Sequence, residues 1–100
     1  MVINGVNFPA EAIAEICRRY GAKSLSLFGS ILRDDFTESS DVDILVEFLP
    51  QTRIGLIGMA HMEAELGETI GRRVDLRTPG DLSRYFRDEV VSHARPLHAA

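Results

Sequence analysis

Three short segments of the chain alternate between apolar and polar residues. They span residues 24–28, 41–48 and 73–77. Alternate residues of a strand face opposite sides of a sheet, so each segment predicts a β-strand that turns one apolar face to the core. Gly29 and Pro50 follow the first two segments and are expected to end those strands.

Three further segments repeat apolar residues at intervals of three and four, the spacing that gives a helix one apolar face. The first begins near Pro9 and ends at Gly21. The second runs over residues 54–68, and the third ends before Pro96. Their expected apolar faces consist of Ile13, Ile16, Cys17 and Tyr20; of Leu56, Met59, Met62, Leu66 and then Ile70; and of Leu82, Tyr85, Phe86, Val90 and His93, with Glu89 as a polar exception.

The connections between these segments are predicted from their turn residues. Residues 2–6 contain an Asn-Gly pair between apolar residues, which indicates either a tight hairpin or a frayed start. A short helix is expected over residues 30–34, a polar loop over 35–40 and a turn over 78–80. Residues 97–100 are expected to form a short strand or a loose tail.

Strands and helices in this order predict an α/β (α+β) fold, in which a small mixed sheet carries its helices on one face. A chain of 100 residues suits a single domain, expected to span residues 1–100. Apolar residues make up 45% and charged residues 26% of the sequence, as is typical of a soluble globular protein. No apolar run approaches the roughly 20 residues that span a bilayer, so we expect neither a membrane segment nor a signal peptide.

Charge and cysteine content narrow the expected partners and compartment. The net charge is −4, and an acidic chain gains little from counterion release, so we expect no direct binding to nucleic acid. The single cysteine, Cys17, cannot form an internal disulfide, which predicts a cytoplasmic protein. Because Cys17 lies on an apolar helix face, we interpret it as a core residue and not as a nucleophile.

Two carboxylates stand side by side on the open face of the second predicted strand. Val42 and Ile44 take the core face, so Asp41 and Asp43 lie together on the other. Neighbouring carboxylates repel each other, and a hard divalent ion such as Mg²⁺, which prefers oxygen ligands, relieves that repulsion. Asp75 is in the same phase on the third predicted strand, so all three carboxylates are expected on one face.

This set of residues predicts a metal–nucleotide site. Three carboxylates on an exposed sheet face can hold two Mg²⁺ ions about 3.5–4 Å apart, which stabilise the entering and leaving oxygens of a nucleotidyl displacement. Gly29 and Ser30, at the predicted strand-to-helix turn, allow a phosphate to approach backbone N–H groups closely. Arg33 either neutralises phosphate charge or pairs with Asp34 and Asp35, and both possibilities stay open.

Gly29-Ser30 followed by Asp41-x-Asp43 resembles the nucleotidyltransferase motif of the DNA polymerase β-like superfamily. In detail the chain is similar to the minimal nucleotidyltransferase (MNT) family, the antitoxins of HEPN/MNT toxin–antitoxin pairs. The resemblance implies that Asp41 and Asp43 bind the metal ions, and that Asp75 is a third ligand or the base that takes the acceptor's proton. It also implies that Gly29 and Ser30 bind the triphosphate.

The same resemblance implies a reaction and a partner. AMP is expected to pass from ATP, with Mg²⁺, to a tyrosine hydroxyl of a partner HEPN ribonuclease toxin, which is thereby silenced. Leu32 and Asp34 flank Arg33, where members of the family usually carry a small residue before the arginine and a glycine after it. This departure leaves the carboxylates intact and bears on the conformation after the turn.

Two other functions compete with this interpretation. The domain could neutralise its toxin by binding alone, with a silent site, or it could modify a small molecule such as an antibiotic. A core of 100 residues leaves little room for an acceptor pocket, which favours an acceptor presented by a partner chain. Transfer that requires the partner would separate the first function from the other two.

Overall fold

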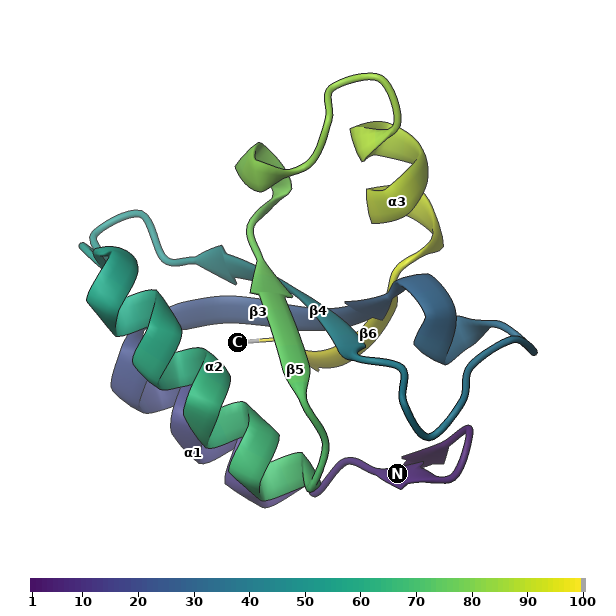
Figure 1. Cartoon of the computed structure of the whole chain (residues 1–100). Coiled ribbons are helices and arrows are strands. Elements are labelled where there is room, and N and C mark those ends of the chain that lie inside the picture. The colour runs from purple at the N-terminus through teal and green to yellow at the C-terminus, as the bar shows by residue number, and fades with distance from the viewer. Residues whose placement is uncertain (100) are drawn as a thin grey trace.

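A computed structural model describes residues 1–99 and builds them around a four-stranded mixed sheet (Figure 1). The strands lie in the order β5-β4-β3-β6. Strand β3 pairs antiparallel with both β4 and β6, whereas β4 and β5 run parallel. The sheet strands are β3 (Ala22–Phe28), β4 (Val42–Phe48), β5 (Val74–Arg77) and β6 (Arg95–Ala99). The predicted mixed sheet is therefore confirmed.

Helices α1 (Ala10–Tyr20) and α2 (Leu56–Ile70) pack side by side on one face of the sheet, whereas the short α3 (Arg87–His93) lies apart from them (Figure 1). Each long helix ends at a glycine with a left-handed backbone, Gly21 and Gly71. The core between these helices and the sheet consists of apolar side chains, with Leu25, Leu27, Ile44, Val46, Met62 and Leu66 fully buried. None of the helices over residues 1–99 combines the length and apolar character needed to cross a bilayer.

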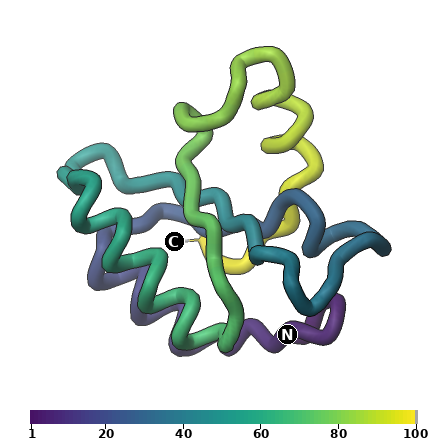
Figure 2. The backbone as a smooth tube through the Cα atoms, in the orientation of Figure 1, coloured from purple at the N-terminus to yellow at the C-terminus, as the bar shows by residue number. Residues whose placement is uncertain are grey.

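The chain begins with a tight hairpin, one of the two forms expected from its Asn-Gly pair. Strands β1 (Val2–Ile3) and β2 (Val6–Asn7) pair antiparallel across Asn4 and Gly5, whose φ angles are 53° and 81°. Two positive φ angles in a two-residue loop match the right-handed twist of the flanking strands. Figure 2 shows this hairpin beside the loop that follows β3.

Two predicted helices are shorter than expected. Instead of a helix over residues 30–34, the chain forms a single 3₁₀ turn, η1 (Gly29–Leu32). The last helix starts at Arg87 and not near Leu82. A second 3₁₀ turn, η2 (Pro79–Asp81), precedes it, because the Asp81 carboxylate accepts a 3.0 Å hydrogen bond from the Thr78 backbone N–H and fixes a turn.

Three apolar positions predicted to face the core are instead exposed. Leu56 is 90% exposed because the buried face of α2 begins only at Met62. Tyr85 and Phe86 are 86% and 51% exposed, because residues 82–86 form an irregular loop and not a helix. The spacing of these residues is helical, but no packed helix exists to give them a common buried face.

Strand β6 begins earlier in the chain than the segment expected over residues 97–100. It begins at Arg95, so Pro96 lies within the strand and opposite Ser26. Proline removes a backbone donor, and β6 is an edge strand, where one unpaired side tolerates that loss. Of the two forms expected here, a short strand or a loose tail, the structure shows the strand, with an earlier start.

Cys17 lies in the core, as predicted, and is expected to be chemically silent in the folded protein. It is fully buried, and burial raises the pKa of its thiol to about 11. Native protein should therefore react with a maleimide at least about a hundredfold more slowly than protein unfolded in guanidinium chloride. Rapid labelling of native protein, followed by mass spectrometry, would contradict this prediction.

Candidate active site

The parallel pairing of β4 with β5 places two of the predicted carboxylates directly opposite each other. Asp43 and Asp75 are register partners across these strands. The residues that precede and follow each of these aspartates are buried: Val42 and Ile44 around Asp43, and Val74 and Leu76 around Asp75. Because neighbouring residues of a strand face opposite sides, both carboxylates must lie on the open face. Asp41 precedes β4 and joins them at the strand's start.

Asp43 is the electrostatic centre of this group. Its side chain is partly buried, and burial raises its pKa above the usual range for an aspartate. The neighbouring charges of Asp75 and Asp41 raise it further, whereas Arg77 and the backbone N–H of Ser30 lower it. The three carboxylates are therefore close enough to repel one another, as the sequence predicted for them.

Two arginines partly neutralise the outer carboxylates. Arg73 donates from Nε to Asp41 Oδ1 at 2.6 Å, and the interaction raises the pKa of Arg73. Arg77 donates to both oxygens of Asp75 at 3.3 Å. Over residues 1–99, no group of three or more acidic, histidine or cysteine side chains converges in a way that could hold a metal ion. The assignment of metal ligands therefore stays a prediction.

The Gly29-Ser30 turn lies against the central carboxylate. Phe28, the last residue of β3, is the register partner of Asp43. Gly29 has φ +75°, and a Cβ atom at that position would overlap with Oδ2 of Asp43. The backbone N–H of the next residue, Ser30, lowers the pKa of the same carboxylate. Only glycine allows the turn to approach Asp43 this closely.

The family model described as "Nucleotidyltransferase domain" matches residues 10–97, nearly the whole chain and every residue of this site. The chain belongs to the nucleotidyltransferase domain family. The likeness covers the sheet, the turn and the carboxylates together, so the predicted enzyme class is confirmed.

Relatives of this nucleotidyltransferase support the same assignment. It is 33% identical over 89 residues to the predicted protein adenylyltransferase MJ0435 of Methanocaldococcus jannaschii, covering 89% of this chain and 94% of that protein. It is also 33% identical to a solved structure of a predicted minimal nucleotidyltransferase, with a TM-score of 0.71 and 87% of each chain covered. The predicted likeness to minimal nucleotidyltransferases is therefore confirmed.

More distant solved structures share the fold of this nucleotidyltransferase. A chain of a toxin–antitoxin crystal structure with AMP-PNP matches at 21% identity and a TM-score of 0.71, with 93% of this chain and 75% of that chain covered. A chain from a complex of a tri-AMPylated Shewanella oneidensis HEPN toxin with its MNT antitoxin matches at 22% identity and a TM-score of 0.63, with 91% and 70% covered.

Arg33 of this nucleotidyltransferase forms an ion pair with Asp35, one of the neighbouring carboxylates expected from the sequence. Its Nε lies 3.1 Å from Oδ1 of Asp35, and both side chains are exposed. The backbone beside it is held by Asn4, whose amide donates to the carbonyl oxygens of Ile31 at 3.1 Å and Arg33 at 2.8 Å. The sequence pattern indicated only a turn-forming role for Asn4 and gave no signal for this long-range contact.

A hollow of about 330 Å³ adjoins the turn and includes residues that sequence reasoning did not assign to the site. It lies between η1 and α3, with His93 and Glu89 on the helix side of the turn. His93 Nδ1 is 2.8 Å from the carbonyl oxygen of Glu89, so Nδ1 donates and Nε2 stays available to accept a hydrogen bond. The hollow is lined by Phe28, Gly29, Leu32, Arg33, Glu89, Val90 and His93.

Proposed function

We propose that this nucleotidyltransferase is an MNT-type antitoxin that transfers AMP from ATP to a tyrosine of a partner HEPN ribonuclease toxin in the cytoplasm. One observation carries the proposal: the Gly29-Ser30 turn touches Asp43, which in turn lies opposite Asp75. A phosphate held by the turn would therefore lie beside the carboxylates. A 33% identical relative named as a predicted protein adenylyltransferase supports a protein acceptor, and fold neighbours from HEPN toxin complexes support this kind of partner.

We infer that the carboxylates bind a pair of Mg²⁺ ions only together with the nucleotide's phosphates, because among residues 1–99 the side chains alone do not converge on a metal position. Their oxygens are hard ligands, and the mutual repulsion that raises the pKa of Asp43 is the condition that a bound cation relieves. Asp41, Asp43 and Asp75 would hold the ions, together with the nucleotide's phosphates. Bound Mg²⁺ supplies positive charge that stabilises the oxygens around the α-phosphorus during displacement.

The chain's own residues would position the reactants. The backbone N–H groups at Gly29 and Ser30 would bind the β- and γ-phosphates of ATP. The acceptor hydroxyl oxygen then attacks the α-phosphorus, the bond to the bridging oxygen breaks, and pyrophosphate leaves. Asp75, which lies opposite Asp43 on the neighbouring strand, would receive the proton of the hydroxyl or complete the set of metal ligands.

Arg33 is expected to contribute to ATP binding and little to stability. It lines the same hollow as Gly29, and its exposed ion pair with Asp35 is worth at most about 1 kcal/mol. Arg33→Gln should therefore raise the KM for ATP about tenfold, with kcat and the melting temperature nearly unchanged. The matched control is Arg18→Gln, at an exposed arginine that pairs with Glu15 outside this hollow. Equal KM values for the two variants would show that Arg33 is only a surface partner of Asp35.

A second function is favoured by the arginine pairs of the site. Arg73 and Arg77 already neutralise Asp41 and Asp75, an arrangement that a silent site in a purely binding antitoxin would also show. The two functions differ in whether the partner gains mass.

The test is the intact mass of the HEPN protein from the same genome after incubation with this chain, ATP and Mg²⁺. The matched controls are the Asp41→Asn/Asp43→Asn variant and an incubation with EDTA. One or more AMP increments with the wild type alone would support transfer, and tryptic peptide mapping would identify the modified residue. An unmodified partner that both versions bind and inhibit equally would establish the binding antitoxin instead.

A further inference from the structure

Two groups of apolar side chains lie exposed at separate places on the surface. The first, here called the α2 patch, consists of Leu56 and Ile57 on the first turn of α2, 90% and 75% exposed. The second, called the loop patch, consists of Tyr85 and Phe86, 86% and 51% exposed. Large apolar side chains gathered at this exposure are typical of protein-binding surfaces.

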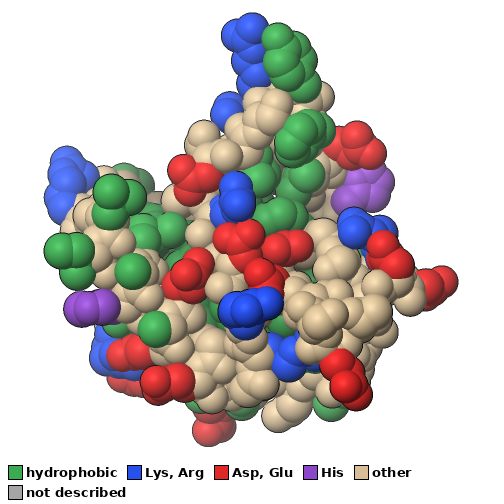
Figure 3. All heavy atoms as spheres, viewed as in Figure 1, with side chains coloured by type: hydrophobic (Ala, Val, Ile, Leu, Met, Phe, Trp, Pro, Cys, Tyr) green, Lys and Arg blue, Asp and Glu red, His purple; other side chains and the backbone are tan. Residues whose placement is uncertain are grey.

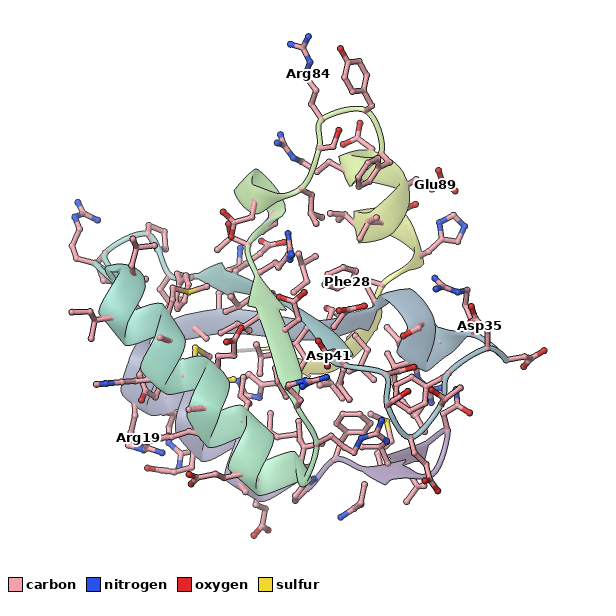
Figure 4. The ribbon with its side chains drawn as sticks, viewed as in Figure 1. Arg19, Phe28, Asp35, Asp41, Arg84 and Glu89 are labelled. Carbon is pink, nitrogen blue, oxygen red and sulfur yellow. The ribbon has the colours of Figure 1, made fainter. Side chains whose placement is uncertain are left out.

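The two patches and the carboxylates can be seen on the same face of the molecule. Figure 3 shows acidic side chains at the centre of this face, with hydrophobic side chains at the start of α2 to the left and on the loop before α3 at the top. In Figure 4, Asp41 lies centrally and Arg84 marks the far end of the loop, which projects away from the sheet. A body that contacts both patches and extends over the centre of this face would cover the carboxylates.

Both patches are presented by segments with fixed conformations. The loop patch follows Leu82, which is buried and whose carbonyl oxygen accepts a 2.9 Å hydrogen bond from Arg87. The chain leading to the α2 patch is held by Thr52, whose hydroxyl donates to the carbonyl oxygen of Gly21 at 2.9 Å. Segments whose backbone is held in this way lose little conformational freedom on binding, which favours affinity.

Each patch carries an arginine that has no carboxylate partner among residues 1–99. Arg53, three residues before the α2 patch, donates only to backbone carbonyl oxygens, those of Pro50 and Thr52. Arg84 lies over the ring of Tyr85, with 5.3 Å between its Cζ and the ring centroid. The other cations near the carboxylates, Arg73 and Arg77, are paired within the chain. These two arginines are therefore free to pair with carboxylates of a partner, although Asp88 and Glu89 add negative charge beside the loop patch.

We propose that the α2 patch and the loop patch form one docking surface for the protein that accepts AMP, and that this protein offers apolar hollows bordered by carboxylates. The inference rests on the proposed function, because the surface lies on the same face as the site of transfer. Tyrosine and arginine are also the side chains most often found at the energetic centres of interfaces. Docking at both patches would hold the acceptor hydroxyl over Asp43 and Asp75.

The size of the molecule is compatible with a single partner at both patches. A typical interface buries about 800 Å² on each side, a region roughly 30 Å across. The principal extents of the chain are 37 × 32 × 23 Å, so an interface of this size spans most of one face. Neither patch alone approaches that area.

The experiment measures binding of the purified HEPN protein from the same genome by isothermal titration calorimetry. The variants are Leu56→Ser/Ile57→Ser, Tyr85→Ser/Phe86→Ser and Arg84→Glu. Each should raise Kd at least about tenfold, because each removes an apolar anchor or reverses a complementary charge. The matched control is Val2→Ser, an exposed apolar position (67%) on the N-terminal hairpin, which should leave Kd unchanged. AMP-PNP should bind all four variants as it binds the wild type.

The outcomes separate the docking surface from the transfer reaction. Partner binding equal to that of Val2→Ser in all patch variants would overturn the docking surface, even if the partner still gains AMP. Loss of binding in the patch variants would support it, even if Asp41→Asn/Asp43→Asn shows that no AMP is transferred. A wild-type chain that sediments as a dimer, with the patch variants monomeric, would assign the patches to a second copy of this chain and overturn the proposal.

Discussion

Replacing Asp43 with asparagine is expected to lower AMP transfer by at least about a thousandfold and, in metal-free buffer at pH 7, to raise the melting temperature. Activity falls because the central carboxylate, which faces Asp75 and the Gly29-Ser30 turn, no longer offers a charged ligand. Stability rises because an amide removes the repulsion from Asp75 and Asp41 and the cost of a partly buried charge.

The pH dependence of stability has a defined sign for this residue. The pKa of Asp43 is raised in the folded protein, so between its unfolded and folded pKa values the native state binds more protons. The free energy of unfolding of the metal-free wild type should therefore gain a favourable contribution as the pH falls through the folded pKa of Asp43. That contribution is absent at pH values above the folded pKa of Asp43, and it should be missing from Asp43→Asn at every pH.

Thermal unfolding with EDTA, at pH values from 7 down to 4, measures this difference. The gap in melting temperature between Asp43→Asn and the wild type should be largest at pH 7 and should narrow with acidification. Glu47→Gln, at an exposed acid of the same strand, is the matched control and should show no such narrowing. A variant that is less stable than the wild type at pH 7 would mean that the Asp43 charge stabilises the fold.

Replacing Gly29 with alanine is the second change expected to have a large effect, and here activity and stability should fall together. A residue with a Cβ atom held at φ +75° lowers the free energy of unfolding by about 1–2 kcal/mol relative to glycine. The added carbon would also overlap with Oδ2 of Asp43 and displace that side chain. A shift of about 1 Å in a reacting group can reduce the rate about a hundredfold, so we expect a loss of that order in kcat/KM.

Chemical denaturation and steady-state assays of Gly29→Ala test both effects. Gly80→Ala is the matched control, because its backbone needs no positive φ and its nearest neighbour to an added Cβ lies at 3.7 Å. It should be close to the wild type in both measurements. A Gly29→Ala protein that keeps full activity would show that the turn does not need to approach Asp43 closely.

The local sequence pattern was sufficient to predict the strands that carry the carboxylates and the face on which these side chains lie. The two-residue period of β4 and β5 placed Asp43 and Asp75 on one face, because a strand with Val42, Ile44, Val74 and Leu76 in the core leaves no other side for the acids. The same period predicted the strands themselves, and the Gly29-Ser30 step predicted the turn at the end of β3.

Pattern was least informative where burial depends on distant elements. The helical spacing of Leu82, Tyr85 and Phe86 predicted one buried face, yet the Thr78–Asp81 turn ends the regular structure first and only Leu82 is buried. Leu56 followed the apolar period of α2 but lies before the part of the helix that the core covers. A period describes which residues share a face and does not say whether anything packs on it.

The sequence by itself determined the fold class, the three acids on one face and the glycine turn, because these follow from backbone periods of two and from the absence of a Cβ atom. Only the tertiary structure decided which strands are neighbours, and with that the pairing of Asp43 with Asp75 and the contact between Gly29 and Asp43. It also decided that Asn4 holds the turn from 27 residues away and that the apolar patches are exposed on the same face as the site. Strand order, long-range hydrogen bonds and exposure depend on how distant segments pack, and no local pattern records that.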